Sequence, residues 1–157
     1  MDNIKTVEGE LNARDLRFTI VAARFNEFIV ESLIKASLHC LRRHGASDNA
    51  IELIRVPGAY EMPLAVEKVA ANRRADGIIA LGAVIRGGTP HFDYVAGECM
   101  NGVAAVGRQY GVPIGMGVLT VNTIEQAIER AGTKAGNKGE EATLAVIEMV
   151  NLLRHLD

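Results

Sequence analysis

Short apolar runs alternate along this chain with longer stretches in which apolar residues recur at every third or fourth position. Short runs rich in β-branched residues and bounded by turn or polar residues predict buried β-strands. The longer stretches predict amphipathic helices, each with one buried stripe. The strands expected from this pattern are Arg17–Ala23, Ile51–Val56, Gly77–Val84 and Pro113–Thr120.

A helix is expected after every strand. Apolar residues at helical spacing run from Val30 to Leu41, with Asn26 placed to cap the start of that helix and Gly45 to end it. The further helices expected are Glu61–Ala71, Phe92–Tyr110, Ile124–Ala131, which Thr123 and Gln126 begin with a capping-box pattern, and Glu140–Leu156 after a Gly/Lys-rich link, Gly132–Gly139.

The order of these elements predicts the fold class. Strands that alternate with helices pair in parallel, because right-handed crossovers place the helices on the two faces of the sheet. We therefore expect an α/β fold: a three-layer α-β-α sandwich, flavodoxin-like, with a central four-stranded parallel sheet. The 157 residues fit one domain, 1–157, in which Met1–Asp15 form an N-terminal arm that could pack on a neighbouring subunit.

Composition narrows the classes of partner. The 17 basic and 19 acidic residues leave a net charge of −2, which argues against a nucleic-acid partner. The N-terminus has no apolar signal core and no stretch is long enough to cross a membrane, so a cytoplasmic protein without a membrane partner is expected. Cys40 and Cys99 are isolated in sequence, which predicts two buried thiols and no metal site.

Candidate chemistry gathers where the strands end. Ligands of parallel α/β sheets bind at the carboxyl ends of the strands, and the unusual residues of this chain lie there. An exposed Phe25 either stacks on a planar ligand or packs on its helix as a hydrophobic staple. Glu61 either accepts hydrogen bonds from a ligand or is a first-turn acid of its helix. The strand-end segments are Arg24–Asn26, Pro57–Glu61, Arg86–His91 and Met116–Thr120.

The segment after the third strand carries the strongest signal. Its Gly87-Gly88-Thr89 sequence lets backbone amides approach a phosphate closely, although the glycines could equally serve only a tight turn. Arg86 could bind the same anion or form a structural ion pair. His91 follows at the start of a helix, where an imidazole can transfer protons near neutral pH. Lys134 and Lys138 by themselves indicate only a solvated link.

Together, the blocks Arg24–Asn26, Pro57–Glu61, Gly82–Val95 and Ile124–Gly139 resemble the lumazine synthase family, and the resemblance runs from about Arg17 to the C-terminus. It implies a transferase of riboflavin biosynthesis that condenses 5-amino-6-(D-ribitylamino)uracil with 3,4-dihydroxy-2-butanone 4-phosphate, releasing phosphate and water. The resemblance implies no metal and no cofactor. The alternatives are a flavodoxin-like domain that binds a phosphorylated ligand without turnover and a mainly structural shell protein.

The resemblance also implies roles for individual residues. His91 would move protons. The pyrimidine would lie against Phe25, Ala59, Tyr60, Glu61, Ala83, Val84, Ile85 and Met116, the last standing where the family leads us to expect an aromatic residue at the end of the fourth strand. The phosphate would be bound by Gly88, Thr89, Arg130 and Lys138.

An oligomer is implied as well. Members of the family form pentamers whose sites are shared between neighbouring subunits, and some pentamers assemble into icosahedral shells of sixty chains. The short link Gly132–Gly139 resembles that of the shell-forming members, so we expect a 60-subunit shell. Riboflavin synthase is a candidate partner enclosed by such a shell.

Overall fold

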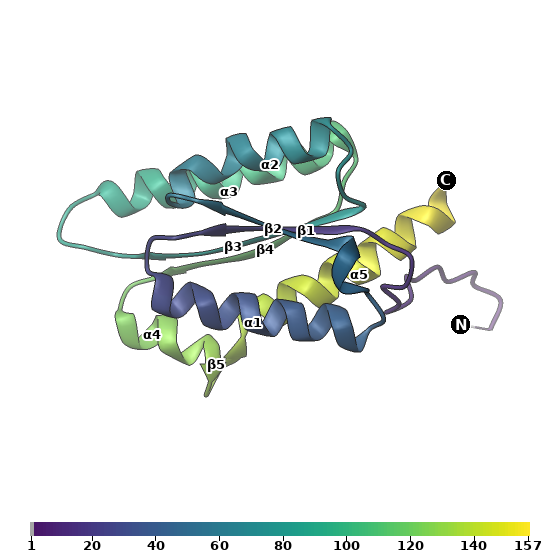
Figure 1. The fold of residues 1–157 in the computed structure, drawn as a ribbon, viewed down its shortest axis with the longest axis horizontal. Coiled ribbons are helices and arrows are strands. Elements are labelled where there is room, and N and C mark those ends of the chain that lie inside the picture. Colours follow the sequence, from purple (N-terminus) through teal and green to yellow (C-terminus); the bar gives the residue numbers. More distant parts are fainter. Residues whose placement is uncertain (1) are drawn as a thin grey trace.

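The computed structural model describes residues 2–157 and shows one four-stranded parallel sheet with the order β2-β1-β3-β4. Helices cover both faces of the sheet (Figure 1). The α-β-α sandwich and its flavodoxin-like strand order are therefore confirmed. The strands are β1 (Phe18–Ala23), β2 (Ile51–Val56), β3 (Gly77–Ile85) and β4 (Ile114–Val121), each within two residues of its expected bounds.

The helices form one layer on each side of the sheet. Helices α1 (Glu27–Arg43) and α5 (Lys138–Leu156) pack together on one face, and α2 (Met62–Ala71) and α3 (His91–Tyr110) on the other. The short α4 (Ile124–Glu129) lies on the same side as α1 in Figure 1. Two 3₁₀ helices, η1 (Asp48–Ala50) and η2 (Ala59–Glu61), adjoin β2. In residues 2–157, no helix has the length and apolar character that crossing a membrane requires.

The sheet divides the hydrophobic core into two clusters. Successive residues of a strand point to opposite faces, so Ile20 and Ala22 of β1 face α1 and α5, while Val21 and Ala23 face α2 and α3. Both faces are covered, which explains why β1 and β3 are apolar at consecutive positions.

Both cysteines are buried, as the sequence predicts, and each core cluster holds one of them. Cys40 lies in the cluster beneath α1 and α5, and Cys99 in the cluster beneath α2 and α3. Both are free thiols, and burial raises the pKa of each to about 11. Neither sulfur is therefore a ready nucleophile at neutral pH.

Two of the predicted helix boundaries hold and one cap is wrong. Gly45 follows α1 with a φ of +104°, as expected for a helix end, and Thr123 Oγ1 accepts the Gln126 N–H at 3.1 Å. Asn26, however, does not cap α1 with its side chain. It adopts a left-handed conformation, φ +63°, and its amide Nδ2 donates instead to the Ala83 carbonyl at 2.8 Å. A tertiary hydrogen bond has replaced the local one.

The link before α5 is a hairpin, not a flexible connection. Strands β5 (Ala131–Thr133) and β6 (Gly136–Asn137) pair antiparallel, and β5 contacts α1. Gly132 and Gly136 make the turn possible, because both have positive φ, +119° and +82°. The hairpin shortens α4 and lets α5 begin two residues early, at Lys138, with Asn137 as its side-chain cap.

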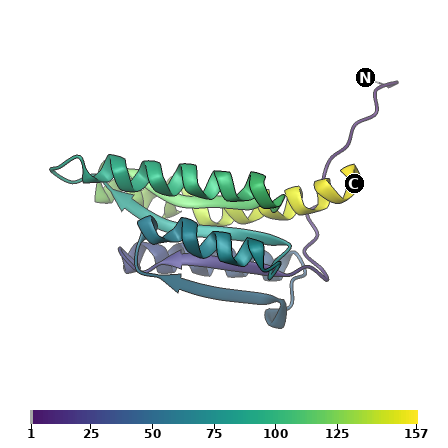
Figure 2. The ribbon, with the colours of Figure 1, turned by 90° about the horizontal axis from the view of Figure 1, so that it is seen from above.

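The part of the N-terminal arm nearest to β1 packs against α5 of the same chain. Gly9 packs so closely on α5 that an added Cβ would overlap the Glu148 carbonyl. Asn151 donates to the carbonyls of Glu10 and Asn12 at 2.7 and 2.9 Å, and His155 lies 2.9 Å from Glu10. The preceding residues leave the body (Figure 2), with Ile4 and Val7 exposed; Met1 of the predicted arm lies outside the described residues.

Candidate functional site

The segments that follow β1, β2 and β3 line a cavity of about 700 Å³, here called the aromatic cavity. It opens at the carboxyl edge of the sheet, where ligands of parallel α/β folds bind. The cavity brings together nine of the residues predicted for the site. Its lining comprises Phe25, Asn26, Pro57, Gly58, Ala59, Tyr60, Glu61, Ala83, Val84, Ile85, Gly87, Thr89, His91, Phe92 and Val95.

The Phe25 side chain is 72% exposed at the mouth of this cavity. A hydrophobic staple would be packed on α1, so that alternative does not fit. The backbone around the ring is fixed: Phe25 N–H donates to the Pro57 carbonyl at 3.1 Å, and the next residue is Asn26, bonded to Ala83. An exposed aromatic ring on a fixed backbone offers a flat surface on which a planar ligand can stack.

Strand β3 presents an open edge to the aromatic cavity. Its pairing with β1 ends at Leu81, whereas its pairing with β4 continues to Ile85. Within residues 2–157, the β1-facing edge of Gly82–Ile85 therefore has no strand neighbour. The Asn26 amide satisfies the Ala83 carbonyl on that edge, and main-chain groups further along it can hydrogen-bond to a ligand as they would to a strand.

The loop after β3 supports close approach by a ligand. Gly87 and Gly88 do not have positive φ, and a Cβ added to either would meet nothing within 4 Å. Neither a strained turn nor crowding explains them, so the tight-turn interpretation does not fit. Thr89 and His91 line the cavity with Gly87; Gly88 lies exposed between them and is outside the lining set. His91 is the first residue of α3 and its side chain is exposed.

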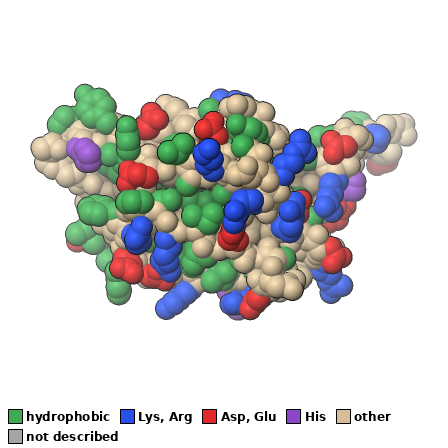
Figure 3. Space-filling view, turned by 45° about the horizontal axis from the view of Figure 1, so that its top comes forward, with side chains coloured by type: hydrophobic (Ala, Val, Ile, Leu, Met, Phe, Trp, Pro, Cys, Tyr) green, Lys and Arg blue, Asp and Glu red, His purple; other side chains and the backbone are tan. Residues whose placement is uncertain are grey.

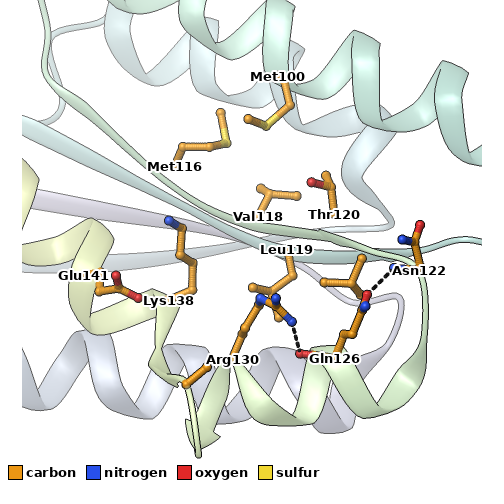
Figure 4. Close-up of a pocket in the computed structure, with 12 residues that line it drawn as sticks. Met100, Met116, Val118, Leu119, Thr120, Asn122, Gln126, Arg130, Lys138 and Glu141 are labelled. Carbon is orange, nitrogen blue, oxygen red and sulfur yellow. Dashed lines mark hydrogen bonds between the residues drawn. The ribbon is translucent and has the colours of Figure 1, made fainter.

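A second cavity, of about 710 Å³, lies beside β4 and is here called the cationic cavity. Its basic residues, Arg130 and Lys138, flank the β5–β6 hairpin, and the Lys138 N–H donates to the Arg130 carbonyl at 2.9 Å. Arg130 Nη1 donates to the Gln126 carbonyl at 3.1 Å (Figure 4). The lining comprises Met100, Met116, Val118, Leu119, Thr120, Val121, Asn122, Gln126, Arg130, Ala135, Lys138 and Glu141.

Met116 belongs to this second cavity and does not end β4. It is the third residue of the strand, opposite Ala80, because β4 continues to Val121. Its half-buried side chain points toward Met100 of α3 (Figure 4). The expectation that Met116 lies at the end of the strand is therefore wrong. Within one chain, Met116 also lines a different cavity from the other residues predicted for the pyrimidine.

The predicted site residues other than Gly88 thus divide between two cavities with opposite character. Among the described residues that line the aromatic cavity there is no lysine or arginine. The cationic cavity has two, Arg130 and Lys138, but its described lining includes no aromatic ring and no histidine. The residues predicted for the phosphate are themselves divided, because Thr89 lies in one cavity and Arg130 in the other.

A comparison with protein-family models identifies the family of this chain. The model for 6,7-dimethyl-8-ribityllumazine synthase matches residues 15–154 of the 157-residue chain. The chain belongs to this family. Membership makes it a transferase and assigns it lumazine synthase activity in riboflavin biosynthesis. The matched region includes both cavities and excludes most of the N-terminal arm.

Sequence reasoning missed three polar residues of the lumazine synthase fold that line the cationic cavity: Asn122, Gln126 and Glu141. Gln126 was assigned only to a capping box, but its side-chain carbonyl also accepts the Asn122 N–H at 2.7 Å. Glu141 lies three residues after Lys138 in the first turn of α5. That spacing places two side chains on one face of a helix, so a helix beginning at Lys138 would have revealed the pair.

Proposed function

We propose that the chain condenses 5-amino-6-(D-ribitylamino)uracil with 3,4-dihydroxy-2-butanone 4-phosphate to form 6,7-dimethyl-8-ribityllumazine, phosphate and water. The observation that carries this proposal is the division of the site into two complementary halves. One half offers an aromatic plate, an open strand edge and an imidazole, and the other offers two cations. A planar pyrimidine and a phosphate ester need one half each.

The aromatic cavity is proposed to hold the pyrimidine. Phe25 stacks on the ring, and the main chain at Ala83, Val84 and Ile85 hydrogen-bonds to the ring edge. Two observations support this placement: the exposure of Phe25 and the open edge of β3 beyond Leu81. Glu61, exposed at the end of η2 with Ala59 and Tyr60, accepts hydrogen bonds from the ribityl hydroxyls.

The phosphate needs charge that the aromatic cavity lacks. Gly88 and Thr89 offer only neutral donors, and the described lining of that cavity has no lysine or arginine. We therefore propose that each site combines the aromatic cavity of one protomer with the cationic cavity of the next. Arg130 and Lys138 then bind the phosphate as charge-assisted donors. Met116, half-buried in the same cavity, contributes apolar surface against the pyrimidine.

Exposed apolar side chains support a homo-oligomer. Phe28 is 84% exposed, Leu64 66% and Ile124 59%, and further hydrophobic side chains lie on the face shown in Figure 3. Because Phe28, Leu64 and Ile124 lie on three different helices, α1, α2 and α4, we infer that more than one face of the chain meets a neighbouring subunit. A ring in which every aromatic cavity meets a neighbouring cationic cavity closes on itself, and we propose a pentamer. The compact β5–β6 hairpin, which carries no insertion, is compatible with further assembly into a shell.

The chemistry follows from these groups. The amine of the pyrimidine attacks the ketone of the second substrate, and loss of water gives an imine, so no catalytic lysine is required. Removal of a proton from carbon then expels phosphate and leaves an enol, which becomes a ketone. The ribitylamino nitrogen attacks this ketone, and loss of a second water closes the ring. His91 carries protons between substrate and solvent, while Arg130 stabilises the departing phosphate. The protein contributes mainly by holding two reactants in contact.

Mixed oligomers test both the activity and the sharing of sites. The unmodified protein should form the fluorescent lumazine from the two substrates; no product would refute the activity. His91→Ala and Arg130→Ala proteins should each be impaired. When the two are unfolded together and reassembled in equal amounts, about a quarter of sites should receive His91 and Arg130 from different chains and regain activity.

The control is the same pair of proteins mixed without unfolding, which should stay impaired. If co-assembled oligomers of normal mass regain nothing, the sites are not shared between protomers.

A further inference from the structure

Arg86 lies directly after β3, between the two cavities, and is not among the residues that line either of them. Its backbone N–H donates to the Val121 carbonyl at 2.8 Å and so continues the pairing of β3 with β4. The guanidinium makes three contacts. Its Nε donates to Asn122 Oδ1 at 2.9 Å, its Nη1 lies 3.5 Å from Asp93 Oδ1, and its carbon lies 4.4 Å from the centre of the Phe92 ring.

Two of these contacts lead to the aromatic cavity. Phe92 lines that cavity, and Phe92 and Asp93 follow His91 in the first turn of α3. The guanidinium therefore holds the turn of helix that carries His91. A positive charge over an aromatic face and a carboxylate at its edge fix the plane of the group from two directions.

The third contact leads to the cationic cavity. Asn122 accepts from Arg86 through its side chain, while its own N–H donates to Gln126 Oε1 at 2.7 Å. The main-chain carbonyl of Gln126 accepts from Arg130 Nη1 at 3.1 Å. Dashed lines in Figure 4 mark the last two bonds of this series. A continuous chain of contacts thus runs from the His91 turn to the Arg130 guanidinium.

We propose that Arg86 is a positioning residue that holds the His91 turn and the Arg130 side chain in register, and that it does not bind the substrate anion. The inference rests on the proposed function, in which His91 and Arg130 of one chain serve two different sites. A single guanidinium then maintains one half of each of two neighbouring sites. This resolves the two roles that the sequence leaves open for Arg86 in favour of the structural ion pair.

Lysine should not replace arginine in this role. Each contact alone is weak, because Arg86 and Asp93 are both exposed to solvent. The position of the guanidinium comes from making all three contacts at once, which requires a planar group with several donors. An ammonium carries the same charge but has no plane to lie over Phe92 while bonding to Asn122 and Asp93.

Steady-state kinetics of Arg86→Ala and Arg86→Lys separate the two roles. We expect Arg86→Ala to lower kcat about tenfold and to raise the KM of the butanone phosphate several-fold. Arg86→Lys should be similarly impaired, with both constants within about threefold of those of Arg86→Ala. An anion contact gives a different result: only the KM of the phosphorylated substrate rises, and lysine restores most of it.

Variants of Asp93 and Asn122 separate the effect of Arg86 on the His91 turn from its effect on Arg130. Asp93→Ala should mainly lower kcat, because it frees the His91 turn, and Asn122→Ala should mainly raise the KM of the butanone phosphate. The double variant Arg86→Ala/Asn122→Ala should have a phosphate-substrate KM close to that of Arg86→Ala alone, because both changes remove one interaction. Multiplying effects would show that the two residues act separately and would overturn the proposal.

Hydrogen–deuterium exchange provides a readout that does not depend on activity. Arg86→Ala should increase amide exchange both in residues 89–95 and in residues 122–130, at unchanged particle mass. Arg42→Ala is the matched control, because it removes an exposed Arg–Asp pair at 2.8 Å elsewhere on the surface, and it should alter neither segment nor the kinetics. An increase in only one segment, or in neither, would refute the tie between the cavities. Absence of lumazine formation by the unmodified protein would refute only the proposed activity.

Discussion

The two cavities of the chain are built in different ways. The aromatic cavity is assembled from three segments far apart in sequence, joined by tertiary bonds such as that from Asn26 to Ala83. The cationic cavity comes almost entirely from one stretch, Met116–Glu141, with Met100 as its contribution from another element. Most of the residues that shape the cationic cavity are therefore near neighbours in sequence. The aromatic cavity depends on the relative placement of the segments that follow β1, β2 and β3.

Removing the charge from the cationic cavity should have the largest effect. Arg130→Ala should raise the KM of the butanone phosphate about 10-fold to 100-fold, because a charge-assisted contact contributes about 1.5 to 3 kcal/mol. The KM of the pyrimidine should change little. Lys134→Ala is the control, since this exposed lysine of the same hairpin is not among the cavity-lining residues. Equal losses for both substrates would show that the two cavities do not divide the substrates between them.

Removing the imidazole from the aromatic cavity should affect rate more than binding. His91→Ala should lower kcat by ~10-fold to ~100-fold, at or below the usual range for general acid/base groups, because solvent can replace a proton shuttle. Both KM values should stay within a few-fold of the original. Rate measurements across pH for the variant and the unmodified protein check this. An unchanged kcat would remove His91 from the mechanism.

The bond between Asn26 and Ala83 tests how far the aromatic cavity depends on tertiary contacts. Asn26→Ala should destabilise the chain by about 1 to 2 kcal/mol, because it loses a hydrogen bond and places alanine in a left-handed conformation. Asn26→Gly keeps the left-handed conformation and loses only the hydrogen bond, so its unfolding midpoint should lie between those of the unmodified protein and Asn26→Ala. The KM of the pyrimidine should rise a few-fold in both variants. A glycine variant with the original KM would show that the bond does not shape the cavity.

The two cores should resemble each other even though the cavities differ. Burial raises the pKa of Cys40 and Cys99 to about 11, above the ordinary value of 9.0, so the unfolded chain loses these protons first as the pH rises. Stability should therefore fall between about pH 9 and pH 11. Thermal unfolding of Cys40→Ala and Cys99→Ala should each show a shallower fall over this range. A change in only one of them would mean that the two faces of the sheet differ in more than their cavities.

The fold and the aromatic cavity could be predicted because their signals are local and repeated. Continuous apolar strands such as Gly77–Ile85 and helical stripes such as that of α1 state their burial directly. Strand-end residues such as Phe25 and His91 could be assigned to one edge because parallel strands end together. Asn26 shows the limit: its sequence favours a helix cap, but the Ala83 carbonyl on a strand 57 positions away was the better partner.

The cationic cavity was less predictable from the residues alone. Lys138 looked like part of a solvated link, because the pairing of β5 with β6 depends on two glycines with positive φ and on packing of β5 against α1. Only the resemblance to lumazine synthases pointed to Lys138. The role of Arg86 was also open, because its partners Asp93 and Asn122 lie 7 and 36 residues away on different elements.

The contact between Glu10 and His155 has a practical consequence for rearranging the chain. It places Glu10 of the N-terminal arm against the last turn of α5, and this end of α5 lies opposite the β3–α3 loop (Figure 1). A linker can therefore join a chain that begins near Glu10 to the end of α5, and the circle can be reopened at the exposed turn at Gly111, where α3 gives way to β4. Such a circular permutant should fold with its new termini far from both cavities. It could be displayed or immobilised through those termini while the carboxyl edge stays accessible.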